Sequence, residues 1–116
     1  MATRTETRFG EIASLGVTYT IVGSAVASAT TWNLLLAVTN RTGANANLRA
    51  YIADTSWSSG EPTGGTLKAA IAYDLPIAAG DVVQLSGYVL NATEKLVVRS
   101  SVAASLDVTA QGIAIT

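Results

Sequence analysis

Hydrophobic and polar residues alternate with a period of two in several short segments of the chain. In the segment 48–53, Leu48, Ala50 and Ile52 fall on one face, while Arg49 falls on the other. Because successive side chains of a β-strand point to opposite faces of a sheet, this alternation predicts a strand with one buried face. The same period recurs in four later segments, namely 82–90, 95–99, 105–109 and 112–116.

The alternation also predicts which side chains share a face in these segments. The expected sets are Val83, Leu85, Gly87 and Val89, pointing inward; Leu96 and Val98; Leu106 and Val108; and Ile113 and Ile115. The segment 32–39 is apolar on both faces, which is typical of a central strand. Gly, Asn, Asp or Pro interrupts the runs about every 8–12 residues, a spacing typical of a sandwich or barrel.

The pattern therefore predicts an all-β protein. We expect a single antiparallel β-sandwich of about eight strands, with jelly-roll or immunoglobulin-like topology. The length of 116 residues fits one domain. We assign residues 9–116 to the sandwich and residues 1–8, which are polar and of mixed charge, to an N-terminal arm outside it.

Composition excludes several classes of function. The chain has no His and no Cys, so it lacks an imidazole base, a thiolate nucleophile and the common zinc ligands. We accordingly expect no cofactor and no metal. Seven Lys and Arg residues against eight Asp and Glu residues form no basic stripe for nucleic acid. No apolar run is long enough to span a membrane, and the N-terminus resembles no signal peptide.

Carboxylates provide the nearest approach to catalytic chemistry. Asp74 and Asp81 flank a short apolar segment, and a glycosidase requires two carboxyl groups close together in a cleft lined by aromatic side chains. Aspartate is also an ordinary turn residue, and this second interpretation is favoured here. We expect that the protein is not an enzyme, and a small hydrolase is the least favoured hypothesis.

Two segments are candidate partner contacts. The polar loop 55–65 carries Trp57, which either folds back over one end of the sandwich or projects into a partner as an anchor. The arm is either disordered, as termini often are, or ordered by docking on another subunit. The candidate contact residues are Thr3, Arg4, Glu6, Arg8, Phe9, Trp57, Arg41 and Arg49, with Arg99 as a further rim charge.

The order of these signals resembles a known family. The segments that carry the resemblance are 16–22 (GVTYTIV), 32–41 (WNLLLAVTNR), 48–53 (LRAYIA), 73–81 (YDLPIAAGD) and 90–98 (LNATEKLVV). They are similar to the small β-sandwich virion structural proteins of tailed bacteriophages. Glu94-Lys95 stands where these proteins usually have Asp, which is a departure from the pattern.

The resemblance implies a structural part of a virion. We expect a capsid decoration (cement) protein, made in the cytoplasm of a host bacterium, that binds the outside of the major capsid protein lattice and stabilises the head. Such a protein could be a homotrimer or a monomer. The alternative is a tail or fibre component that binds carbohydrate, with Tyr51, Trp57, Tyr73 and Tyr88 as stacking planes if they share one face.

Overall fold

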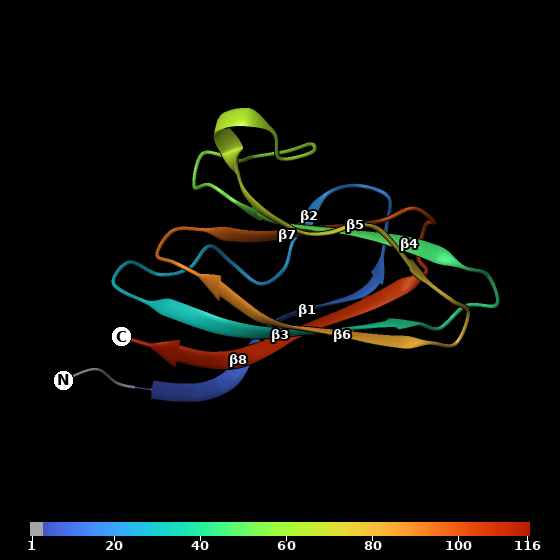
Figure 1. The fold of residues 1–116 in the computed structure, drawn as a ribbon, viewed down its shortest axis with the longest axis horizontal. Coiled ribbons are helices and arrows are strands. Elements are labelled where there is room, and N and C mark those ends of the chain that lie inside the picture. The colour runs from blue at the N-terminus through green and yellow to red at the C-terminus, as the bar shows by residue number, and fades with distance from the viewer. Residues whose placement is uncertain (1–3) are drawn as a thin grey trace.

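A computed structural model describes residues 4–116 and, among these, every side chain except that of Thr5. This part of the chain forms eight strands and one short 3-10 helix, arranged in two layers (Figure 1). The strands are β1 (Arg4–Leu15), β2 (Thr20–Ile21), β3 (Thr31–Asn40), β4 (Ala46–Ala53), β5 (Leu67–Ile77), β6 (Val82–Leu90), β7 (Lys95–Ser100) and β8 (Leu106–Ile115), and the helix is η1 (Gly64–Thr66). The prediction of an all-β sandwich of about eight strands is confirmed.

The strand order decides between the two expected topologies. One sheet, here called sheet A, has the order β1-β8-β3-β6, and the other, sheet B, has the order β2-β7-β4-β5. The first strand therefore pairs with the eighth, the second with the seventh, the third with the sixth and the fourth with the fifth, all antiparallel. A long hairpin rolled into two sheets gives this order, so the fold is a jelly roll and not an immunoglobulin-like sandwich.

The core lies between the two sheets, where the alternating apolar side chains meet. On β3, Leu34, Leu36 and Val38 are buried while the residues between them are exposed or half-buried. β3 lies between β8 and β6, which confirms the prediction of a central strand for residues 32–39. The predicted inward residues of β4, β7 and the first half of β8 are buried, namely Leu48, Ala50, Ile52, Leu96, Val98, Leu106 and Val108. The prediction of one buried face is wrong for the second half of β8, because Ile113 and Ile115 lie on the outer side of the sheet and are half-buried.

The prediction for β6 is right for its first half and wrong for its second. Val83 and Leu85 pack against the core as expected. Gly87 has a φ of +86° and forms a bulge opposite β3, so that two successive residues of β3 pair with Ser86 and Tyr88. A bulge inserts one extra residue and reverses the alternation beyond it. Val89 consequently points outward and is 43% exposed.

The expected N-terminal arm is wrong for residues 4–8. These residues form the first part of β1 and pair regularly with β8, from Arg4 opposite Ile115 to Arg8 opposite Gln111. The backbone hydrogen bonds of the ladder hold them, so no apolar pattern is needed at the edge of the sheet. Thr3, the remaining member of the expected contact set in the arm, lies outside the residues that the structure describes.

Candidate interaction surfaces

The outer faces of the two sheets differ in what lies on them. In the register of sheet A, Glu6 lies beside Ile113, and Ile113 lies beside Asn33. One step along, Arg8 lies beside Gln111, and Gln111 lies beside Leu35. Because residues directly opposite each other in a ladder point to the same side, and the even-numbered residues of β3 point inward, all these side chains lie on the outer face.

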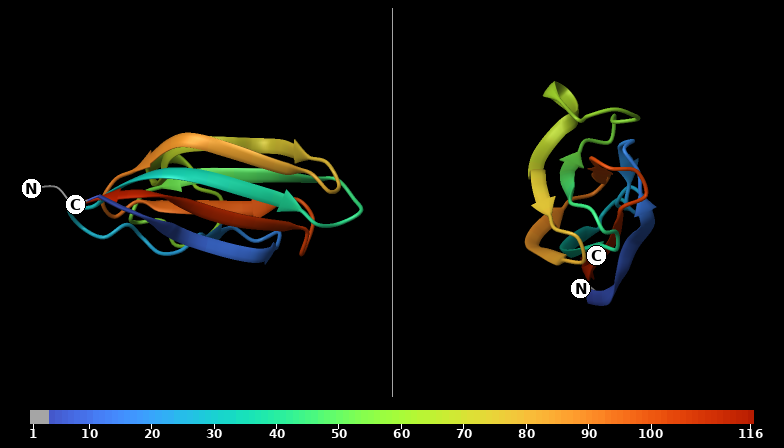
Figure 2. Two further views of the ribbon diagram at one scale, coloured as in Figure 1. Left: turned by 90° about the horizontal axis from the view of Figure 1, so that it is seen from below. Right: turned by 90° about the vertical axis from the view of Figure 1, so that its right-hand side faces the viewer.

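This outer face holds a groove of about 460 Å³ between β1 and β3. Its lining residues are Glu6, Thr7, Arg8, Leu35, Gln111, Gly112 and Ile113. The side chains of Leu35 and Ile113 are half-buried and apolar, and Glu6 and Arg8 on the edge strand are exposed. Seen from below, the strands of sheet A face the viewer, and no loop of residues 4–116 crosses their middle (Figure 2, left). We call this surface the open face.

The outer face of sheet B is covered by the chain itself. Residues 54–66 leave β4 and fold over this sheet, where Trp57 packs with Ala53 and Val97 in a second small apolar cluster (Figure 1). Trp57 is only 7% exposed, and its Nε1 donates a hydrogen bond of 2.8 Å to the carbonyl oxygen of Gly60. The Lys95 ammonium donates to the carbonyl oxygens of Thr55 and Trp57 at 3.0 and 2.7 Å. We call this surface the closed face.

Of the two alternatives for Trp57, the structure therefore shows the first. Its indole folds back onto the sheet, and the alternative in which it projects outward as an anchor does not hold. Burial of the ring against β4 and β7 removes a large apolar surface from water, which explains the preference.

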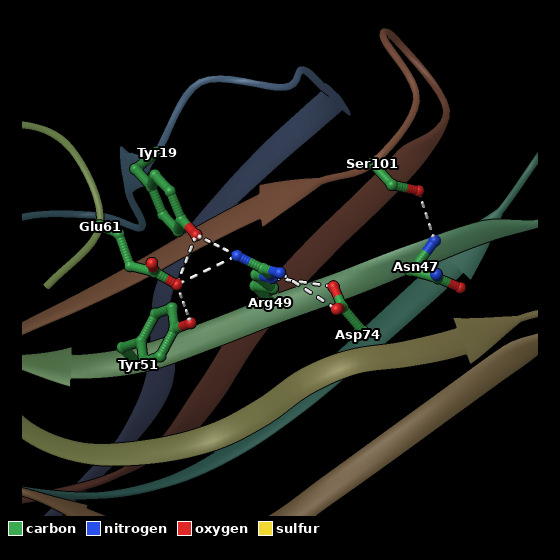
Figure 3. Close-up of polar contacts among 7 residues, drawn as sticks. All are labelled: Tyr19, Asn47, Arg49, Tyr51, Glu61, Asp74 and Ser101. Carbon is green, nitrogen blue, oxygen red and sulfur yellow. Dashed lines mark hydrogen bonds and ion pairs between the residues drawn. The ribbon is translucent and has the colours of Figure 1, made fainter.

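A polar network fastens the same loop to the sheet (Figure 3). Oε1 of Glu61 accepts hydrogen bonds from the hydroxyl groups of Tyr51 and Tyr19, at 2.7 and 3.1 Å, and from Nη1 of Arg49 at 3.1 Å. The hydrogen bond from Tyr51 is the main cause that lowers the pKa of the Glu61 carboxyl below its ordinary value. Burial is the main cause that raises the pKa of the Tyr51 hydroxyl.

Arg49 is the centre of this network and is paired within the chain itself. Its Nε and Nη2 donate to the two carboxylate oxygens of Asp74 at 2.8 and 3.0 Å, and its guanidinium lies 4.2 Å from the ring centroid of Tyr73 (Figure 3 shows the ion pair). Asp74 has a φ of +51° and lies where the register of β4 and β5 shifts, which directs its carboxylate at Arg49. The hydrogen bond from Arg49 lowers the pKa of Asp74.

The remaining predicted contact residues lie apart from one another. Phe9 lies against the core, where it makes an edge-to-face contact with Trp32 at 5.1 Å between ring centroids. Arg41, at the end of β3, forms an ion pair with Asp107 and donates to Oγ of Ser14 at 3.3 Å. The structure brings together Arg4, Glu6 and Arg8, as neighbours on the edge of sheet A, and also Arg49 and Arg99, which lie opposite each other on β4 and β7.

Three residues that line the groove of the open face are not among the predicted contact residues, namely Leu35, Gln111 and Ile113. The sequence did carry a signal for two of them. Residues 32–39 are apolar on both faces, and Ile113 and Ile115 share a face. An apolar outer face on a sheet that has no further layer over it is the combination that indicates a contact surface.

The four aromatic side chains proposed as carbohydrate-stacking planes do not share one face. Trp57 and Tyr51 are both buried within the closed face. Tyr88 pairs opposite the buried Leu34 and is half-buried on the inner side of sheet A. Tyr73 is 63% exposed on β5, where one side of its ring is taken by Arg49.

Within residues 4–116, no group of three His, Cys, Asp or Glu side chains is placed to hold a metal ion. The described part of the chain also contains no helix with the length and apolar character needed to cross a membrane.

The topology is one that known proteins share. The strand order defines an eight-stranded jelly roll, an architecture used by viral capsid domains, lectin domains and cupins. No protein-family model matches the sequence, and no curated protein matches it.

Solved structures do match the fold. A chain of the T13 viral particle of infectious bursal disease virus superimposes with a TM-score of 0.55 and 12% identity, over 98% of this chain and 30% of that one. A chain of the VP2 subviral particle of the same virus gives a TM-score of 0.50 and 13% identity, over 99% of this chain and 32% of that one. At these identities the similarity shows the fold alone, and this chain spans less than a third of either viral chain.

Proposed function

We propose that the protein is a non-enzymatic structural component of a virion. In particular, we propose a capsid decoration protein that binds the outside of the major capsid protein lattice of a bacteriophage head and stabilises it. The observation that carries the proposal is the open face, where Leu35 and Ile113 present apolar side chains beside the charged Glu6 and Arg8. The fold supports it by analogy, since chains of virus particles share the jelly roll over nearly the whole of this chain.

The arrangement of the open face fits a docking surface. An apolar centre with a polar rim is the usual anatomy of a protein interface, because the centre gains free energy from burial while the rim stays hydrated. The sheet that carries it is held rigid by the core on its other side. A rigid surface loses little conformational entropy on binding, which favours association.

The proposed effect on the capsid follows from mass action. A protein that binds the assembled lattice more tightly than its dissociated subunits stabilises the assembled state. Many identical sites on one head add their contributions, so each contact can be modest. A homotrimer at a local threefold axis is one form that such a protein could take, and the proposed function does not depend on it.

The test uses heads that lack the protein, to which purified protein is added back. We expect wild-type protein to raise the melting temperature of the heads. The variant Ile113→Lys places a charge in the middle of the open face, and we expect its affinity for the heads to fall at least tenfold. The matched control is Ala70→Lys, which adds the same charge at an exposed position of β5 in sheet B.

Two outcomes contradict the proposal. One is a melting temperature of the heads that is the same with and without the protein. The other is an Ile113→Lys variant that binds as tightly as wild type, which would remove the open face as the docking surface.

A further inference from the structure

The edge strands of the two sheets are not equally protected against pairing with another strand. β2 is only two residues long, and β5 contains Pro76 and several shifts of register against β4. β6 is interrupted by the Gly87 bulge. Short strands, prolines, bulges and charged side chains are devices by which proteins protect sheet edges.

The first half of β1 has only the last of these devices, the charged side chains of Arg4, Glu6 and Arg8. From Arg4 to Arg8 it pairs with β8 without irregularity, and the first shift of register falls between Arg8 and Gly10. Beyond that shift the strand is covered, because the backbones of Gly10 and Gly23 approach so closely that a Cβ at Gly10 would lie 2.5 Å from the Gly23 nitrogen. The first half of β1 lies at the lower margin of the molecule, beside β8 (Figure 1).

The charges on the segment 4–8 of β1 alternate in sign. Arg4, Glu6 and Arg8 all lie on the outer face of sheet A, as their register with β8 requires. Arg8 forms an ion pair of 3.3 Å with Glu11, in which both side chains are at least 60% exposed, so Arg8 remains accessible to another partner. Exposed pairs of this kind are weak and exchange readily.

We propose that two copies of this chain pair antiparallel through this segment of β1, about a twofold axis at Thr7. In that register Glu6 of each copy lies opposite Arg8 of the other, which gives two identical cross-strand ion pairs. Opposite charges across an antiparallel pair are favourable, and like charges in the same place are unfavourable. A shift of the axis to Glu6 or to Arg8 places like charges opposite each other, so the charges disfavour these two registers. An axis at Thr5 would instead pair Arg4 with Glu6 and leave Arg8 outside the pairs, so the variant Arg8→Glu distinguishes that register from the one at Thr7.

The pairing makes sheet A of both copies one continuous eight-stranded sheet. The two open faces then lie side by side on the same surface, because a twofold axis perpendicular to a sheet keeps its outer face outward. Dimerisation is a property of the purified protein alone and does not depend on the proposed function.

The test is the oligomeric state of the purified protein at low ionic strength, measured by sedimentation equilibrium. We expect wild type to form dimers. Either single substitution, Glu6→Arg or Arg8→Glu, places like charges opposite each other twice, and we expect the dissociation constant to rise at least tenfold. The double variant, Glu6→Arg with Arg8→Glu, restores opposite charges, and we expect it to dimerise again.

The matched control for Glu6→Arg is Asp81→Arg, which makes the same change of net charge at an exposed turn away from β1. Circular dichroism establishes that each variant keeps its β-structure. Wild-type protein that stays monomeric would overturn the proposal. So would the finding that β1 pairs only with a strand of a different protein. Dimers that survive either single substitution, or a double variant that stays monomeric, would also overturn it.

Discussion

The two outer faces of this sandwich are built from the same kind of strand but differ in whether described residues of the chain cover them. Over sheet B, the loop of residues 54–66 folds back, buries Trp57 and ties itself down through Glu61 and Arg49. Over sheet A, Leu35 and Ile113 remain half-exposed, with no described segment to cover them. The comparison shows that this chain covers the apolar outer face of sheet B with its own loop. On sheet A the apolar side chains are left half-exposed, so a partner that buried them would gain free energy there.

The largest expected effect comes from removal of the aromatic ring under the closed face. The substitution Trp57→Ala opens a cavity against Ala53 and Val97, and we expect it to lower the free energy of unfolding by about 3 kcal/mol. The matched control is Tyr73→Ala, which removes an aromatic ring that is 63% exposed and should cost less than about 1 kcal/mol. Urea denaturation measures both, and equal losses would contradict the distinction between a closed and an exposed aromatic side chain.

A smaller effect is expected from the hydroxyl group of Tyr51. Tyr51 is 3% exposed, and its hydroxyl group donates a hydrogen bond to Glu61 at 2.7 Å. The substitution Tyr51→Phe keeps the ring and removes that hydrogen bond, so we expect a loss of about 1 kcal/mol. Tyr88→Phe is the control, because that side chain belongs to sheet A. No change in stability for Tyr51→Phe would mean that the network does not fasten the loop.

The closed face should also make stability depend on pH in the acid range. The pKa values of Glu61 and Asp74 are lowered in the folded protein by hydrogen bonds from Tyr51 and Arg49 respectively. The unfolded chain therefore binds protons first, so the stabilisation is complete above the ordinary carboxyl pKa of about 4 and is lost as pH falls through the lowered values.

The measurement is the melting temperature between pH 7 and pH 2. We expect the melting temperature of the double variant Glu61→Gln with Asp74→Asn to fall less between pH 7 and pH 2 than that of wild type. Asp81→Asn, in the turn before β6, is the matched removal of a carboxylate away from the closed face. Parallel curves for wild type and the double variant would show that these two carboxylates do not contribute.

The smallest effect on folding is expected on the open face. Because the Ile113 side chain lies on the outside of sheet A, we expect Ile113→Lys to change the free energy of unfolding by less than about 1 kcal/mol, although it should abolish tight binding to heads. A loss of stability as large as that of Trp57→Ala would show that this face stabilises the fold and is not reserved for a partner.

Much of the fold could be predicted from the sequence, because a period of two determines which side chains share a face. The inward residues of β4, of β7 and of the first half of β8 follow from that rule. The failures have local causes. Gly87 adds one residue to β6 and reverses Val89, and the charged residues of β1 carry no apolar signal because backbone pairing with β8 holds them.

The candidate surface was harder to predict than the fold. Tyr51 points away from the core as its alternation requires, yet it is buried, because Glu61 and its loop return over it. Arg49 has the sequence character of an exposed charge, but its partner Asp74 lies 25 residues away on the neighbouring strand. Contacts of this kind depend on how loops fold back over a sheet, which alternation along one strand does not encode.

The measurement that tests the central claim most directly uses the absence of cysteine from the chain. Two variants each carry one cysteine: Gln111→Cys on the open face, and Ala70→Cys at an exposed position of sheet B. Each variant is labelled with a thiol reagent, once as free protein and once bound to heads. We expect Gln111→Cys to lose its reactivity on heads while Ala70→Cys keeps it. Protection of Ala70→Cys with Gln111→Cys still reactive would contradict the account.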